Sequence, residues 1–162
     1  MEQKTIVLKN GQVKGIYEYF AQQVQQEGKT AEFSYFVYKN AEILVEQYVK
    51  IMNTIYVEQT DTEFQKFTKE NNELALKYAD KDEQGNVIVE NNNYKITKQE
   101  TEFKRESEAL QKKYEEVLKN RQQKIQESMQ FLEQTAEYSM IVMPITKFPD
   151  KTAPAIVGNY GI

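Results

Sequence analysis

The chain has 162 residues, with 21 Lys and Arg against 25 Asp and Glu, so its formal net charge at pH 7 is −4. It contains no His, Cys or Trp, which excludes imidazole acid–base catalysis, thiol nucleophiles, disulfides and the commonest metal ligands. The length predicts one domain over residues 1–162.

The remaining composition is polar but not that of a disordered chain. The sequence has 11 Asn and 17 Gln, beside 11 Tyr and 8 Phe and only 6 Gly and 3 Pro. Aromatic side chains supply the apolar area that disordered compositions lack. Elongated helices with a narrow apolar seam reconcile these facts, because they need less core per residue.

The first predicted elements are a strand over 5–9 and a short helix over 13–26. The strand is rich in β-branched residues and ends at Asn10-Gly11, a dipeptide suited to positive φ in a tight turn. In the helix, apolar residues recur at three- and four-residue spacing, and Gly28 supplies the stop.

A long helix is predicted over 31–79, a stretch without Gly or Pro that carries two apolar stripes. Between the stripes, residues 58–63 allow two interpretations. Thr60 and Glu63 form a capping box that would start a new helix, or the stretch is the solvated part of one continuous helix. We favour continuity, because nothing there forbids helix.

Turn residues and short extended segments then predict a β-hairpin over 86–96, followed by a second long helix over 98–138. Thr97 and Glu100 form a capping box directly before the periodic apolar run of this helix. Neither long helix can bury its seam alone. The expected fold is therefore mainly α, a long antiparallel helical hairpin or coiled coil with the β-hairpin at its tip.

The C-terminal part is apolar and contains Pro144 and Pro149, which exclude helix. A strand over 140–146 is predicted, and the antiparallel hairpin would bring it to the N-terminal strand to form a small sheet. For the tail over 150–162, the sequence leaves two alternatives, a loose segment or a segment docked elsewhere.

Residues 80–91 nearly match a calcium-binding loop. Asp80, Asp82, Gln84 and Asn86 occupy alternate positions, and Gly85 stands at the required sixth place. The twelfth position needs a bidentate Glu and holds Asn91 instead. We therefore favour an acidic hairpin turn, and we expect neither a metal nor another cofactor.

No catalytic residues are predicted. Carboxylate pairs such as Glu115 with Glu116 lie on an amphipathic helix with lysines interleaved, which is typical of a solvated face. A di-iron bundle would need Glu-x-x-His motifs, and the chain has no His. We therefore expect a non-enzymatic protein.

The cluster over 33–38 holds more aromatic residues than one helical stripe can bury. Phe33 and Phe36 share a face, which leaves Tyr35 and Tyr38 pointing partly elsewhere. Packing within the core is the favoured interpretation, and contact with a partner is the alternative. The candidate partner contact comprises Tyr35, Tyr38 and the adjacent Lys39 and Asn40.

Five short motifs accompany these elements in order along the chain. They are Leu8-Lys9-Asn10-Gly11, Lys39-Asn40, the turn over 78–86, Tyr94-Lys95-Ile96 and the segment over 141–145. In this order they resemble a group of small uncharacterised proteins encoded by tailed phages and prophages of low-G+C bacteria. The resemblance covers the chain to about Pro149, while residues 153–162 have no counterpart. It implies a viral origin and supplies no catalytic residues.

The expected function is that of a phage-encoded protein–protein interaction module in virion assembly or an accessory role. The alternative is an anti-defence protein that inhibits a host immune factor. The expected partner is a phage or host protein, with a homo-oligomer through the helices as a further expectation. Neither the apolar runs nor the mildly acidic charge indicates a membrane or nucleic-acid partner. The expected location is the host bacterial cytoplasm, or the virion.

Overall fold

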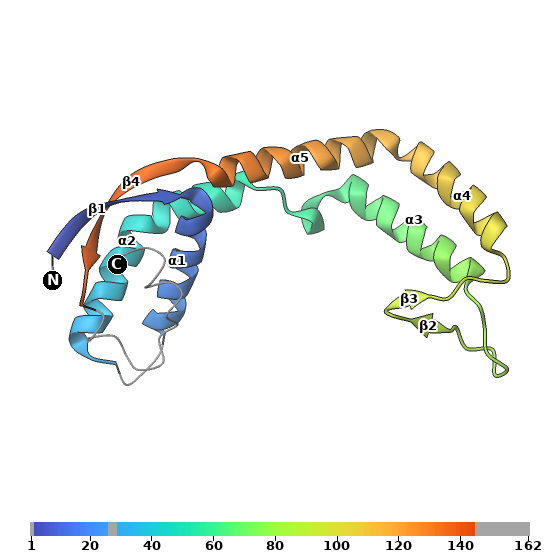
Figure 1. The fold of residues 1–162 in the computed structure, drawn as a ribbon, viewed down its shortest axis with the longest axis horizontal. Helices are drawn as coiled ribbons and strands as arrows, with labels where there is room; N and C mark the ends of the chain where they lie inside the picture. Colours follow the sequence, from blue (N-terminus) through green and yellow to red (C-terminus); the bar gives the residue numbers. More distant parts are fainter. Residues whose placement is uncertain (1, 26–28, 145–162) are drawn as a thin grey trace. The chain divides into compact units, whose positions relative to one another are not determined.

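A computed structural model describes residues 2–25 and 29–144 of the chain (Figure 1). The chain forms two compact units, which are described separately: unit 1 comprises Met1–Ile55 and Glu127–Ile162, and unit 2 comprises Tyr56–Gln126. The prediction of one domain stays a prediction. The structure is mainly helical, with a small sheet formed by the N- and C-terminal strands, as expected. Its elements in order are β1 (Glu2–Lys9), α1 (Asn10–Val24), α2 (Ala31–Thr54), η1 (Glu58–Thr60), α3 (Thr62–Tyr78), β2 (Val89–Glu90), β3 (Asn93–Tyr94), α4 (Glu100–Lys113), α5 (Glu115–Glu133) and β4 (Thr135–Val142).

In unit 1, β1 and β4 pair antiparallel from Lys9↔Thr135 to Glu2↔Val142 (Figure 1). The pairing of the terminal strands is confirmed, but the predicted end of the last helix and the predicted start of the C-terminal strand are wrong. The helix expected to reach residue 138 ends at Glu133, and the strand expected over 140–146 begins at Thr135. Pairing with β1 satisfies the backbone groups of residues 135–138 and overrides their helical periodicity. Residues 145–146 and the tail over 150–162 lie outside the described residues.

The turn predicted at Asn10-Gly11 is wrong, because both residues begin α1. Asn10 is buried, and its backbone N–H donates to the carbonyl oxygen of Gln134 at 2.9 Å. Its side-chain amide donates to the carbonyl oxygen of Phe131 at 2.8 Å and accepts from Gln47 at 2.7 Å. Asn10 therefore joins α1, α2 and the C-terminal end of α5 by hydrogen bonds.

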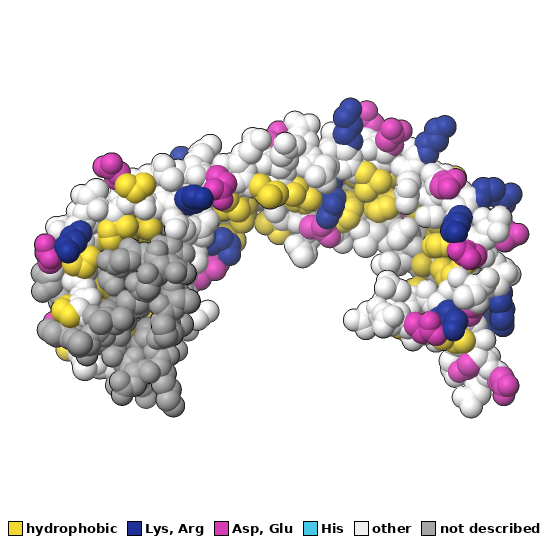
Figure 2. All heavy atoms as spheres, viewed as in Figure 1, with side chains coloured by type: hydrophobic (Ala, Val, Ile, Leu, Met, Phe, Trp, Pro, Cys, Tyr) yellow, Lys and Arg dark blue, Asp and Glu magenta, His cyan; other side chains and the backbone are white. Residues whose placement is uncertain are grey.

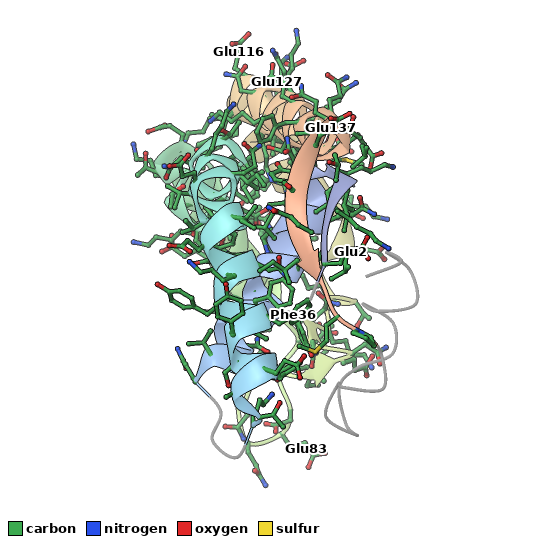
Figure 3. The ribbon with its side chains drawn as sticks, turned by 90° about the vertical axis from the view of Figure 1, so that its left-hand side faces the viewer. Glu2, Phe36, Glu83, Glu116, Glu127 and Glu137 are labelled. Carbon is green, nitrogen blue, oxygen red and sulfur yellow. The ribbon has the colours of Figure 1, made fainter. Side chains whose placement is uncertain are left out.

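The core of unit 1 lies between α1, α2 and the sheet. The rings of Phe20 on α1 and Phe36 on α2 meet edge to face, with centroids 5.6 Å apart. Figure 3 labels Phe36 on the side of α2 that is turned toward the strands. The core consists of Leu8, Val13, Ile16, Phe20, Phe33, Phe36, Val37, Leu44, Ile51, Met140 and Met143.

The continuous helix predicted over 31–79 is broken, and the prediction of continuity through residues 58–63 is wrong. Helix α2 ends at Thr54, η1 follows, and α3 begins at Thr62. The predicted capping box of Thr60 and Glu63 is not used. Asp61 caps α3 instead, because its carboxylate accepts from the backbone N–H of Phe64 at 3.1 Å.

In unit 2, α3 and α4 pair antiparallel. The segment of chain that connects them contains a small hairpin, in which β2 pairs with β3. The hairpin predicted over 86–96 is confirmed, with only two residues in each strand. Asn91 and Asn92 form its turn at φ values of 51° and 62°. Positive φ at both central residues matches the twist of the flanking strands.

The second long helix is also interrupted. Helix α4 ends at Lys113, and Tyr114 leaves helical geometry at φ −105° and ψ 16° before α5 begins. The capping box predicted at its start is wrong too: the N-cap is Gln99, and the hydroxyl of Thr97 donates to the carboxylate of Asp80. The start of α4 thus follows a contact with Asp80, and its end at Tyr114 contacts Phe67 and Glu70 of α3.

Candidate functional site

The outward face of α2 in unit 1 carries a row of exposed apolar and aromatic side chains. Tyr35 and Tyr38 are 49% and 55% exposed, and Val49 and Met52 continue the row. Spacings of three, eleven and three residues place these four side chains on one side of the helix, while Phe36 and the other buried residues of α2 face the core. Tyr35 and Tyr38 therefore lie off the core face, and their contact with a partner stays a prediction.

Lys39 lies beside this face and is held by its own helix. Its ammonium group lies 2.8 Å from the carboxylate of Glu42 and 5.7 Å from the ring centroid of Tyr38. The hydrogen bond to Glu42 raises the pKa of Lys39 above its usual value. Lys39 thus forms an ion pair with Glu42 beside the row rather than an unpaired positive charge.

Asn40 does not belong to the surface, which corrects its place among the candidate contacts. It is fully buried, and its side-chain amide forms two hydrogen bonds of 2.9 Å with the backbone of Ile141 on β4. It is a polar residue on the apolar face that includes Phe36 and Leu44. This position in the helical pattern is the sequence signal that would have identified it as structural.

The acidic turn after α3 uses its two aspartates to bind backbone groups. Asp80 accepts from the N–H groups of Thr97 and Lys98 at 3.0 and 3.2 Å. Asp82 accepts from the N–H groups of Gln84 and Asn86 at 2.9 and 2.8 Å. The hydrogen bond from the Thr97 hydroxyl, followed by those from the backbone, lowers the pKa of Asp80, and the backbone hydrogen bond from Asn86 is the main cause of the lowered pKa of Asp82. The structure therefore shows the interactions of an acidic turn at the positions where a calcium loop would need ligands.

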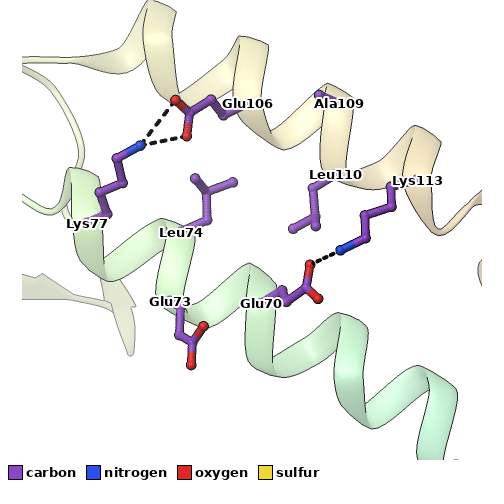
Figure 4. A pocket seen from close by; sticks show the side chains of 8 residues that line it. All are labelled: Glu70, Glu73, Leu74, Lys77, Glu106, Ala109, Leu110 and Lys113. Atoms are coloured by element: carbon purple, nitrogen blue, oxygen red, sulfur yellow. Dashed lines mark hydrogen bonds and ion pairs between the residues drawn. The ribbon is translucent and has the colours of Figure 1, made fainter.

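A groove of about 490 Å³ runs between α3 and α4 in unit 2. Figure 4 shows Leu74 and Leu110 between two ion pairs, one formed by Lys77 with Glu106 and the other by Lys113 with Glu70. Figure 2 shows hydrophobic side chains flanked by charged ones over these helices. Glu73 and Ala109 complete the lining.

The charged groups of this groove bind each other. The hydrogen bond from Lys113, followed by that from Tyr114, lowers the pKa of Glu70. Lys77 and Tyr78 lower the pKa of Glu106 in the same way. Both carboxylates are thus ionised at neutral pH and accept hydrogen bonds, which suits helix pairing rather than proton transfer.

The residues of this groove are not among those expected from the sequence, and neither is a second set of contacts, between α5 and the segment from η1 to the start of α3. The carboxylate of Glu58 accepts from Arg121, and Asp61 lies 2.9 Å from the ammonium group of Lys124. The guanidinium group of Arg121 also lies over the ring of Phe64, 4.4 Å from its centroid. Glu58 and Arg121 are 63 positions apart, as are Asp61 and Lys124, and no sequence motif links them. Only the folded structure shows these contacts.

Comparison with protein-family models, with curated proteins and with solved structures gives no match. Among residues 2–25 and 29–144, no three His, Cys, Asp or Glu side chains are grouped as they would be around a metal ion. In the described part of the chain, no helix combines the length and apolarity that a membrane crossing requires.

Proposed function

We propose that the chain is a phage-encoded, non-enzymatic protein–protein interaction module that serves virion assembly or structure. The observation that carries this proposal is the row of exposed side chains on α2, in which two tyrosines lie one helical turn apart. Tyrosine is enriched in protein interfaces because its ring gives contact area and its hydroxyl a hydrogen bond. The resemblance to small phage proteins supports the viral origin.

The long antiparallel hairpin or coiled coil expected from the sequence belongs to this proposal as its scaffold. The antiparallel pairing of α3 with α4 supports it. In unit 1, packing of α2 on α1 and β4 fixes the inner face of the helix. The outer face is thereby held rigid, which lowers the entropic cost of binding a partner.

The experiment is a pull-down from infected host cells with three versions of the full chain: wild type, Y35S/Y38S and Y94S. Tyr94 is an exposed tyrosine on the hairpin of unit 2 and serves as the matched control. We expect a virion protein to be captured by the wild type and by Y94S, and to be lost with Y35S/Y38S. Equal capture by all three versions would show that the α2 face does not bind the partner.

Mass spectrometry of purified phage particles separates the two expected roles. A virion component is present in the particles at a fixed stoichiometry. If the chain is absent from particles and the protein captured through Tyr35 and Tyr38 is a host immune factor, the anti-defence alternative replaces the virion role. Rescue of phage plating in a host that carries that immune system would then be the confirming measurement.

A further inference from the structure

Unit 2 contains the same residue pattern twice, once in α3 and once at the end of α4. The pattern is Phe-x2-Glu-x3-Leu-x2-Lys-Tyr, and its two copies cover 67–78 and 103–114. We call each copy a clamp motif. The equivalent residues are Phe67 and Phe103, Glu70 and Glu106, Leu74 and Leu110, Lys77 and Lys113, and Tyr78 and Tyr114.

The carboxylate of each clamp motif is bound by the other motif. Glu106 lies 2.8 Å from the ammonium group of Lys77 and accepts from the hydroxyl of Tyr78 at 2.8 Å. Glu70 has the equivalent contacts with the second motif: 2.7 Å to the ammonium group of Lys113 and 2.7 Å to the hydroxyl of Tyr114. The two sets of polar contacts are thus related by exchange of the helices.

The aromatic contacts repeat this relationship. The rings of Phe67 and Tyr114 lie 5.5 Å apart, those of Tyr78 and Phe103 lie 6.1 Å apart, and both pairs are tilted by 61°. Tyr78 and Tyr114 are both buried, at 9% and 8% exposure. Equivalent residues therefore have equivalent surroundings, as in a two-fold symmetric helix dimer whose halves are joined in one chain.

This arrangement makes each clamp motif complementary to a copy of itself, in one direction only. In the antiparallel pair, each Glu faces a Lys. A parallel pair would place Glu70 beside Glu106 and Lys77 beside Lys113, and juxtaposed like charges oppose association. The charge order along the helix thus selects both the partner and the orientation.

We propose that the clamp motif is a self-recognition surface whose partner is a second copy of this chain, with α3 of one copy packing on α4 of the other through the contacts seen within one chain. Each interchain clamp contact replaces an equivalent intrachain one, so exchange of the helices between two copies keeps the ion pairs, hydrogen bonds and ring contacts of the clamp motifs. Exchange of identical elements is a low-cost route to dimers. The pairing uses residues of unit 2 and is independent of the α2 face.

The connection between α3 and α4 determines whether pairing stays within one chain. The backbone N–H of Asp80 donates to the carbonyl oxygen of Lys95 at 2.7 Å, and its carboxylate binds the N–H groups of Thr97 and Lys98. These bonds hold the two ends of the connection together. An exchanged dimer requires them to open, so weakening them with Asp80→Ala raises the dimer fraction.

The test uses two full-length variants with opposite charges at the clamp. E70K/E106K places four lysines there, and K77E/K113E places four glutamates there. Alone, each variant has like charges facing within and between copies, and we expect a single-chain mass. Mixed in equal amounts, they have opposite charges facing only between chains. We expect light scattering and native mass spectrometry to show a 1:1 complex of twice the chain mass.

The matched control is E70K/K77E/E106K/K113E, which reverses all four charges and restores Lys–Glu pairs within one chain. It keeps the net charge of the wild type. We expect it to exchange with itself but not with the wild type, because mixed pairs would place like charges together. Differently tagged wild-type chains, by contrast, form mixed dimers after concentration and dilution, with a larger yield for Asp80→Ala.

The proposal is overturned if the two oppositely charged variants stay at single-chain mass when mixed while the fully reversed control folds as the wild type does. If either double variant fails to fold alone, the tagged-chain experiment decides. Equal yields of mixed dimers from wild type with wild type and from wild type with the reversed control would then refute recognition through the clamp. Absence of mixed dimers in both cases refutes exchange.

Discussion

The side-chain amide of Asn40 on α2 binds the backbone of Ile141 on β4 through two hydrogen bonds, each 2.9 Å long. The amide group donates to the carbonyl oxygen and accepts from the N–H, as a neighbouring strand would. In unit 1, β4 pairs with β1 at one edge, and Asn40 therefore satisfies the other edge at this point. A buried side chain replaces a third strand there.

Replacing Asn40 with Ala is expected to lower the free energy of unfolding of the chain by about 2–3 kcal/mol, because the two backbone groups of Ile141 lose their partner. The measurement is urea denaturation followed by circular dichroism. Asn53→Ala is the matched control, since Asn53 is exposed on the same helix, and it is expected to change stability by less than about 0.5 kcal/mol. Similar losses in both variants would contradict a special role for Asn40.

Asp61→Ala is expected to destabilise unit 2 by about 1 kcal/mol, the usual cost of removing a helix N-cap. The variant also loses the ion pair with Lys124 on α5. Asp61→Asn keeps an acceptor for the backbone N–H of Phe64 and should recover most of the cap. Thermal unfolding monitored at the helical signal measures the difference.

Glu63→Ala separates the observed cap of α3 from the one predicted from sequence. In a capping box, the Glu63 side chain would bind the N-cap backbone. In the structure, Glu63 instead lies 2.6 Å from the ammonium group of Lys66 at the surface. We expect Glu63→Ala to change stability by less than about 0.5 kcal/mol. A loss of stability as large as that of Asp61→Ala would instead support the predicted capping box of Thr60 and Glu63.

The two clamp carboxylates predict that unit 2 becomes less stable in acid. The pKa values of Glu70 and Glu106 are lowered in the folded chain, chiefly by Lys113 and Lys77. Their stabilisation is therefore present above the unfolded-state pKa of about 4.3 and is lost as the pH falls through the lower, folded-state value. Urea midpoints measured from about pH 6 down to about pH 3 should fall along this range.

The variant E70Q/E106Q removes the titrating groups, so its urea midpoint should depend less on pH in that range. E83Q/E108Q replaces two exposed carboxylates outside the clamp and should keep the slope of the wild type. Because Asp80 and Asp82 also have lowered pKa values, E70Q/E106Q should keep a smaller slope rather than none. An unchanged slope in E70Q/E106Q would rule out the clamp as a source of acid sensitivity.

Two glycines predict opposite results for the same substitution. Gly15 lies within α1, and an added Cβ would meet no atom within 4 Å. Gly15→Ala should therefore stabilise the chain by about 0.5–1 kcal/mol, because alanine loses less backbone entropy in a helix. Gly85 has φ +85°, so Gly85→Ala should destabilise by about 1 kcal/mol or more. Thermal melts of both variants against the wild type test the pair.

Much of the fold was predictable from local pattern. The periodicity of apolar residues located the helices, and turn residues between short extended segments predicted the hairpin over 86–96. The candidate contact was predictable in part: Tyr35 and Tyr38 are off the core face as their spacing indicated, whereas Asn40 is buried. The clamp was missed although its repeated pattern is present in the sequence, because each copy alone looks like an ordinary amphipathic helix.

By itself, the sequence determined the mainly helical class and the absence of His, Cys and Trp chemistry. These two properties depend on composition and on neighbours a few residues apart. The pairing of the terminal strands was predicted indirectly, from the antiparallel arrangement expected for the long helices. Only the tertiary structure decided that α2 ends at Thr54, that β4 begins at Thr135 and that Asn40 binds Ile141. Each of these depends on a backbone or side-chain group finding a partner far away along the chain, and local periodicity carries no record of such partners.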